Sequence, residues 1–572
     1  MFFLSKNKIR FIYVFIISIV TGFIVPATLL VLANIINILT DVIERTRDFN
    51  ELFLPVFFYA GLLFLPTCLQ LIKRRQLMYL ENSANNEWLS TMNEVTKNMS
   101  YIDIEDQSVF DSLKICFNNN RYSIIINLLL NSVSTIVSIV SLMLIFLQYS
   151  WWYPVIILFF VPIVCMFSEK IASKQQDKIY EVENIRRKTD NKSFVLRSRE
   201  YSKEVRLFNA SDFMLNDWYN EQKKVDNQYF KIDMKFGLAS TALSKIKYMP
   251  IFINLILTAY LFILGLFDIG MFIAVSNQII TFSIYDSLSS IFAGIGQIKS
   301  LDRKLLDVLS KIEKVEHEHA FDSIVSIKFD NVTFSYHGSH KAILTNLSFS
   351  IGAGEKVLIV GENGAGKSTI IKLMSGLYLP DKGQVLINGI CTRTLNNQQR
   401  AEIFGVVFQD FTQYSLTLRE NLLMGFEQHE KFDYFGVDKI AEKLSNGFET
   451  LLGREYGESI DLSGGEWQRV ALSRIFCMDK SVLIFDEPTA SLDPIAEVDI
   501  FKQILKYSDK KITIIVTHRL GFSDSADKLL FIQDGTLKEY GTFRNLIINN
   551  GGFAHMYNLQ KELYIKRVDS NE

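Results

Sequence analysis

Residues Gly361–Ser368 read G-E-N-G-A-G-K-S and fit the phosphate-binding loop pattern G-x-x-x-x-G-K-[ST]. The loop follows an apolar run of strand type, Lys356–Val360, and precedes a helical pattern. Such a strand-to-helix turn directs backbone N–H groups into one concavity, where the helix N-terminus adds positive potential. We therefore predict that this loop binds a nucleoside triphosphate. The predicted binding residues are Gly361, Glu362, Asn363, Gly364, Ala365, Gly366, Lys367, Ser368 and Thr369.

A second apolar run, Ser481–Glu487 (S-V-L-I-F-D-E), ends in two carboxylates. A buried strand of this kind delivers Asp486 at its C-terminal end, where Asp486 and the Ser368 hydroxyl can hold Mg²⁺. Lys367 can reach the β- and γ-phosphates. Glu487 comes next and can orient and deprotonate an attacking water. The sequence therefore predicts a complete phosphate-binding and hydrolytic site that uses ATP and Mg²⁺.

The order of these motifs, with L-S-G-G-E at Leu462–Glu466 between them, resembles the nucleotide-binding cassette of ATP-binding cassette (ABC) transporters. The resemblance covers about residues 324–572 and implies an α/β P-loop NTPase fold. It also implies roles for single residues. Gln409 matches the Q-loop that senses Mg²⁺ and the γ-phosphate, Asp493 lies in the D-loop, His518 is the γ-phosphate switch, and Tyr336 is the aromatic that stacks on adenine.

In that family the signature of one cassette closes on the nucleotide held by the other. Ser463, Gly464 and Gly465 would make these contacts, whereas Glu466 replaces the usual Gln, with little expected consequence. A single chain carries one loop and one signature, so we expect a homodimer with two equivalent sites. A heterodimer with a degenerate partner stays open.

The remaining half of the chain has a membrane composition. The 572 residues carry a net charge of −2 and include 45 Phe, and the mean hydropathy is +0.16. The sequence has no excess of basic residues, so its charge does not indicate a nucleic-acid partner. Six segments are long and apolar enough to cross a bilayer, and the resemblance implies an all-α transmembrane domain of exporter type, residues 1–310. The predicted spans lie at about 11–36, 52–72, 123–147, 151–168, 248–267 and 271–296.

Lys and Arg gather at one side of these spans, which predicts cytoplasmic N- and C-termini. On this topology the segments 73–121 and 169–246 are cytosolic helical extensions. They contain two stretches, 102–113 and 199–208, that resemble the coupling regions of exporters, and 311–323 is the expected linker. The alternatives are an ordinary helix start and a solvated charged helix.

Polar residues within the predicted spans leave the cargo site open. A stripe on the third span (Asn127, Asn131, Ser134, Ser138 and Ser141) could line a translocation path or form a small-residue packing face. Asp286 on the sixth span could bind a cationic group of the cargo or pair within the protein.

The segment L-S-G-G-E-W-Q-R, Leu462–Arg469, most resembles exporters of bacterial peptides such as lantibiotics. Because the sequence enters its first span almost at once, we expect no peptidase domain of the kind many such exporters carry. The expected function is export of a modified peptide or other amphipathic substrate across the plasma membrane, by a bacterial protein. A lipid or drug flippase and an ATP-gated regulator remain alternatives.

Overall fold

The computed structural model describes residues 7–281, 284–310, 323–336, 338–339, 341–426, 432–489 and 494–569. The chain divides into two compact units. Unit 1 comprises Met1–Met99 and Asp103–Ile312, and unit 2 comprises Ser100–Ile102 and Glu313–Glu572. Residues 311–322 of the predicted linker lie outside the described residues.

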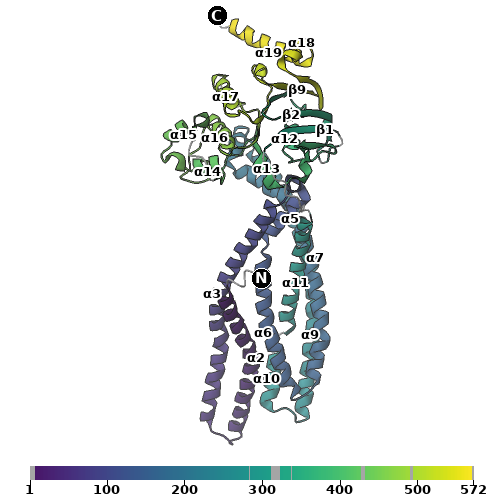
Figure 1. Ribbon diagram of the computed structural model, residues 1–572. Coiled ribbons are helices and arrows are strands. Elements are labelled where there is room, and N and C mark those ends of the chain that lie inside the picture. Colours follow the sequence, from purple (N-terminus) through teal and green to yellow (C-terminus); the bar gives the residue numbers. More distant parts are fainter. Residues whose placement is uncertain are drawn as a thin grey trace. The chain divides into compact units, whose positions relative to one another are not determined.

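The described part of unit 1 is helical (Figure 1). The first two residues of the short α4, Tyr101 and Ile102, belong to unit 2. The elements of this half of the chain are α2 (Lys8–Ile43), η1 (Phe49–Leu52), α3 (Phe53–Lys97), α4 (Tyr101–Glu105), α5 (Gln107–Asn118), α6 (Arg121–Leu147), α7 (Trp152–Arg197), α8 (Arg199–Leu207), α9 (Ser211–Ile263), α10 (Ile269–Thr281) and α11 (Ile284–Leu309).

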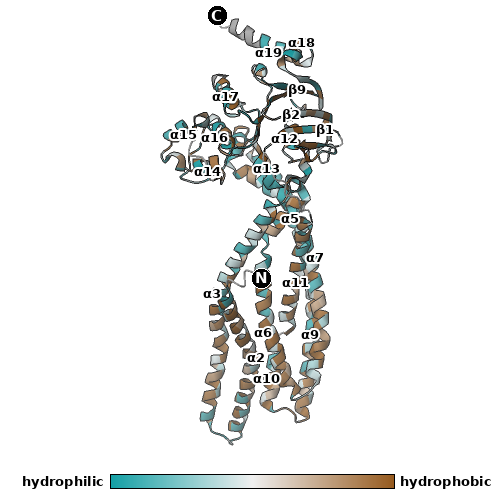
Figure 2. Cartoon of the chain, viewed as in Figure 1, coloured by the Kyte–Doolittle hydropathy of each residue, from teal (hydrophilic) through white to brown (hydrophobic). Residues whose placement is uncertain are grey.

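Six helical segments of unit 1 are long and apolar enough to cross a membrane. At 1.5 Å per residue, the 53 residues of α9 extend about 80 Å, far beyond the ~30 Å apolar core of a bilayer. Figure 2 shows that apolar residues dominate α2, α6 and α10, whereas hydrophilic residues prevail around α5. The predicted span at 248–267 falls on the end of α9. The predicted span at 271–296 covers α10 and the first half of α11.

The helices α2 and α6 approach closely at Gly22. The Ser138 hydroxyl donates a hydrogen bond of 2.8 Å to the Gly22 carbonyl oxygen. A Cβ atom at Gly22 would lie 2.8 Å from both the Ser134 carbonyl oxygen and the Val137 Cβ. Helix association in lipid depends on such small-residue contacts, because burial of apolar surface gives little driving force there.

The described residues of unit 2 form two sheets. The smaller sheet has the order β2-β1-β4-β5 and is antiparallel. The larger sheet has the order β10-β9-β3-β8-β7-β6 and is parallel except for the β10–β9 pair. The strands are β1 (Ser326–Phe334), β2 (Leu344–Gly352), β3 (Lys356–Gly361), β4 (Lys382–Ile387), β5 (Ile390–Cys391), β6 (Phe404–Val407), β7 (Val482–Asp486), β8 (Ile512–Val516), β9 (Lys528–Gln533) and β10 (Thr536–Gly541).

Every residue of β7 and β8 is buried, as expected for parallel strands covered on both faces. The helices α14, α15 and α16 share a separate apolar cluster around Trp467. Unit 2 contains the helical segments α12 (Lys367–Met374), η2 (Thr392–Thr394), α13 (Asn397–Ile403), α14 (Leu418–Leu423), η3 (Tyr434–Gly436), α15 (Val437–Lys443), η4 (Gly447–Glu449), α16 (Gly464–Cys477), α17 (Pro494–Tyr507), η5 (Ser523–Ser525), α18 (Phe543–Ile548) and α19 (Gly552–Asp569).

The close approach of α2 and α6 predicts the effect of one added methyl group. We expect Gly22→Ala to destabilise the protein by about 1–3 kcal/mol, because the two helices must separate to admit the Cβ. Thermal unfolding in detergent measures this as a lower melting temperature. Gly61→Ala on α3 is the matched control, since a Cβ there meets nothing within 4 Å. Equal melting temperatures for the two variants would contradict the proposed packing contact.

Candidate functional site

The loop Gly361–Ser368 connects β3 to α12. The start of the loop packs tightly against β9, because a Cβ at Gly361 would lie 2.1 Å from the Ile532 carbonyl oxygen. Gly366 directly precedes the helix with φ = 97°, in the left-handed region that glycine adopts without strain. The sequence therefore folds here into a narrow turn whose backbone N–H groups and helix N-terminus form an anion-binding concavity.

Lys367 is held inside this turn. Its ammonium group donates hydrogen bonds of 2.9 Å to the carbonyl oxygens of Gly361 and Glu362. Burial lowers the pKa of Lys367, and the carboxylates of Glu487 and Asp486 oppose that shift. A cation fixed at this place can bind and neutralise a phosphate group.

Asp486 ends β7 and is almost fully buried, with 3% of its surface exposed. Burial raises its pKa, whereas a hydrogen bond from the Ser368 hydroxyl and the charge of Lys367 lower it. A carboxylate and a hydroxyl in contact are the hard oxygen donors that Mg²⁺ accepts beside phosphate oxygens. The donor set therefore fits Mg²⁺, and bound Mg²⁺ would neutralise charge on the phosphates.

Glu487 lies between two other residues singled out in the sequence. One carboxylate oxygen accepts a hydrogen bond of 3.0 Å from the Gln409 side-chain amide, and the other lies 3.1 Å from His518 Nδ1. The three residues follow β6, β7 and β8, which are neighbours in the sheet, so their side chains meet at one edge. Glu487 adopts φ = 49°, and its backbone N–H donates to the Val516 carbonyl oxygen. This arrangement fixes a carboxylate in position to accept a proton from water.

Tyr336 is anchored beside the same loop. Its hydroxyl lies 3.1 Å from the Thr369 hydroxyl on α12. Its ring packs edge-on against Phe334 and Tyr378, with centroids 5.1 Å and 5.4 Å away. Because these contacts hold the ring next to the start of α12, a face of the ring can stack on a base.

The signature residues form the N-terminus of α16. Ser463 and Glu466 make a capping box, in which the Ser463 backbone N–H and hydroxyl both donate to the Glu466 carboxylate. These hydrogen bonds lower the pKa of Glu466. A Cβ at Gly464 would meet nothing within 4 Å, so this helix terminus is sterically open. Glu466 thus replaces Gln in a role that either residue can fill. Gly465 lies in the first turn of the same helix, and Asp493 lies outside the described residues.

The structure also identifies supporting residues that the sequence motifs did not indicate. The Gln560 amide on α19 donates to the His518 carbonyl oxygen and accepts from the Leu520 backbone N–H. The Gln468 amide donates to the Pro488 carbonyl oxygen, just after Glu487. Gln560 follows His518 by 42 residues, so no local pattern could have shown the contact.

Three polar residues of the predicted spans have partners within the described part of the protein. Asn127 donates a hydrogen bond of 2.6 Å to Glu81, and Ser138 contacts α2 as described above. Of the two alternatives for Asp286, the structure shows pairing within the protein, because Lys247 Nζ lies 3.1 Å from its carboxylate.

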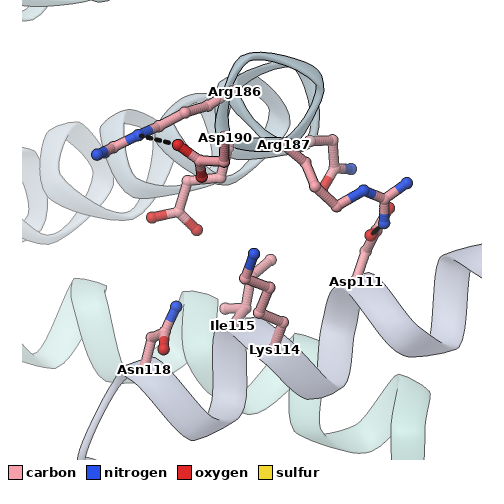
Figure 3. Close-up of a pocket in the computed structure, with 9 residues that line it drawn as sticks. Asp111, Lys114, Ile115, Asn118, Arg186, Arg187 and Asp190 are labelled. Carbon is pink, nitrogen blue, oxygen red and sulfur yellow. Dashed lines mark hydrogen bonds and ion pairs between the residues drawn. The ribbon is translucent and has the colours of Figure 1, made fainter. Parts of the chain in front are cut away.

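A charged space of about 200 Å³ lies between α5 and α7 (Figure 3). Arg187 pairs with Asp111 across the two helices, and Lys114 points from α5 toward α7. Burial raises the pKa of Glu183 in this space, and Arg186 and Lys114 oppose that shift. Three basic and three acidic side chains balance one another here. The cluster therefore links α7 to α5, which contains part of the predicted coupling region at 102–113. The lining residues are Asp111, Lys114, Ile115, Asn118, Glu183, Asn184, Arg186, Arg187 and Asp190.

The chain is similar to known transport proteins. The family model described as ABC transporter matches residues 344–490. The subtilin transport ATP-binding protein SpaT of Bacillus subtilis is 28% identical over 556 residues, which cover 93% of this chain and 88% of that protein. The nisin transport ATP-binding protein NisT of Lactococcus lactis subsp. lactis is 31% identical over 375 residues, 62% of each chain.

A solved structure of a bacterial Atm1-family ABC exporter with ATP bound has a TM-score of 0.80. The match covers 97% of this chain and 99% of that one, at 21% identity. At this identity the likeness concerns the fold alone.

The position of Glu487 predicts the effect of replacing one of its carboxylate oxygens by an NH₂ group. We expect Glu487→Gln to retain ATP binding and to lower ATP turnover by at least about 100-fold, because an amide cannot take the proton of water. Phosphate release and binding of a fluorescent ATP analogue measure the two effects separately. Glu442→Gln, on the exposed side of α15, is the control and should behave as wild type. Wild-type turnover in Glu487→Gln would refute the role of this carboxylate.

Proposed function

Because this chain belongs to the ABC transporter family, we propose that it exports a peptide, with ATP bound at sites shared between two copies of the chain. It is a multi-pass membrane protein and an ATPase coupled to transport. The predicted fold class, a six-helix exporter-type membrane domain with a C-terminal α/β cassette, is confirmed. The cargo, the sharing of sites between two copies and the roles of single residues are proposals.

The observation that carries the proposal is the grouping of Glu487 with Gln409 and His518 at the carboxyl edge of the sheet. In the proposed mechanism the loop Gly361–Thr369 holds the triphosphate and Tyr336 stacks on adenine. Ser368, Gln409 and Asp486 would bind Mg²⁺, which would neutralise charge on the phosphates. Glu487 accepts the proton of the attacking water, and positioning and charge neutralisation supply the remaining catalysis.

Two copies of the chain are needed to complete each site. The sterically open N-terminus of α16, with Ser463, Gly464 and Gly465, offers a hydroxyl and backbone N–H groups to a phosphate. We propose that it binds the γ-phosphate held by the loop of the second copy. ATP then favours the closed dimer, and hydrolysis releases it, because a ligand shifts a conformational equilibrium by its unequal affinity for the two states.

The cargo assignment rests on two of the relatives, whose matches cover 93% and 62% of this chain. Their names state transport of subtilin and of nisin. A peptide-export role for this chain is consistent with its resemblance to peptide exporters in Leu462–Arg469. We further propose that the protein lies in the plasma membrane of a bacterium with both termini in the cytoplasm, as the distribution of Lys and Arg predicts.

The cargo class is tested by stimulation of ATPase activity in reconstituted lipid vesicles. We expect an apolar peptide to raise the ATPase rate of the wild type several-fold and to accumulate inside vesicles in an ATP-dependent manner. A fluorescent phospholipid, followed by chemical quenching of each leaflet, tests the flippase alternative in the same vesicles. ATP-dependent lipid flipping without peptide stimulation or uptake would reject the peptide assignment.

The shared site is tested by combining two defective chains. Lys367→Ala disables the loop, and Gly464→Asp places a carboxylate at an open position where the other copy's phosphate would bind. Coexpressed with different tags and purified through both, the mixed dimer keeps one intact site of two. We expect it to recover about half of the wild-type ATPase rate, whereas each variant alone is inactive. Full activity of a protein that stays monomeric would exclude the shared site.

A further inference from the structure

The first turn of α17 carries a buried carboxylate, Glu497, which is 6% exposed. Burial of a charged carboxylate costs free energy unless the group is paired and hydrogen-bonded. Both oxygens of Glu497 have partners. One accepts a hydrogen bond of 3.1 Å from the Thr489 hydroxyl, and the other forms an ion pair with Arg519.

The two partners belong to the two loops that contain Glu487 and His518. Thr489 follows Glu487 by two residues, after the end of β7. Arg519 follows His518 directly, after the end of β8. The Glu487 carboxylate and His518 Nδ1 lie 3.1 Å apart. A single side chain on a third element therefore binds both loops close to the two groups that meet.

Other side chains hold one of these loops each. The Gln560 amide binds the backbone on either side of Arg519, in the loop of His518. The Gln468 amide donates to a carbonyl oxygen in the loop of Glu487. Glu497 contacts both loops, so its position bears on the distance between them.

A purely structural role explains this arrangement less well. A buried ion pair stabilises a fold only weakly, because the lost hydration of the two ions offsets their attraction. An acidic residue in the first turn of a helix is also favourable at the surface, so α17 does not require Glu497 to be buried. A carboxylate and a planar guanidinium do fix geometry, since their hydrogen bonds are directional.

We propose that Glu497 is a positioning residue for ATP hydrolysis, which keeps the Glu487 carboxylate and the His518 ring at the separation that the reaction requires. It acts through Thr489 and Arg519 and takes no part in proton transfer. The proposal rests on the roles of Glu487 and His518 in the proposed function.

The test replaces Glu497 by Gln in the full-length protein. A Gln side chain has one acceptor oxygen, so it can keep one of the two contacts but not both. We expect the maximal ATPase rate to fall at least about tenfold, because a displacement of ~1 Å in a reacting group can cost about 100-fold in rate. Binding of a fluorescent ATP analogue should be unchanged. Asp499→Asn, at an exposed position of the same helix, makes the same chemical change and should behave as wild type.

A double-mutant cycle with His518→Ala separates positioning from a structural role. If Glu497 acts by placing Glu487 beside His518, Glu497→Gln should have little further effect once the ring is absent. Radioactive ATP keeps the residual rates measurable. A loss by the same factor in both backgrounds would indicate a structural role and would overturn the inference.

A second variant keeps the test decisive if Glu497→Gln lowers the melting temperature. Glu497→Leu combined with Arg519→Met removes both charges and leaves no unpaired ion. This protein should melt near the wild-type temperature and still hydrolyse ATP at least about tenfold more slowly. A wild-type rate in this double variant would contradict the positioning role.

The remaining outcomes distinguish this inference from the proposed function. Full turnover in Glu497→Gln would reject the positioning role and leave the roles of Glu487 and His518 intact. Full turnover in His518→Ala would reject the proposed role of His518, and this inference would fail with it.

Discussion

The parallel sheet of unit 2 is the constraint on which the candidate site depends. Parallel strands need cover on both faces, and β7 and β8 are buried along their whole length. The charged residue of β7, Asp486, is accordingly the last residue of its strand. Because all carboxyl ends of a parallel sheet meet at one edge, residues from four separate strand-to-loop junctions come together without any of them being close in sequence.

The charges at this edge depend on one another. Burial destabilises the ammonium of Lys367 and the carboxylate of Asp486, and each group partly restores the charged form of the other. Glu487 remains at the rim, where Gln409 and His518 position it. The two neighbouring carboxylates thus have different surroundings, since Asp486 is buried and Glu487 is partly exposed.

The sequence was sufficient for features that are local. The turn Gly361–Ser368 requires glycines at fixed places, and the pattern of the loop contains them. The meeting of Gln409, Glu487 and His518 could be predicted only through a known family order, since 78 residues separate the first two. The contact of Gln560 with His518 and the pairing of Lys247 with Asp286 had no local signal, because helix packing brings those residues together.

The membrane half follows a different principle from the cassette. In the apolar core of a bilayer no water is available to replace a lost hydrogen-bond partner. A polar side chain there therefore finds its partner within the protein. Asn127, Ser138 and Asp286 attracted attention in the sequence because they are polar, yet each has a partner in the structure. Polarity in the sequence therefore does not by itself identify a cargo site in this domain, because the fold can satisfy a polar side chain from within.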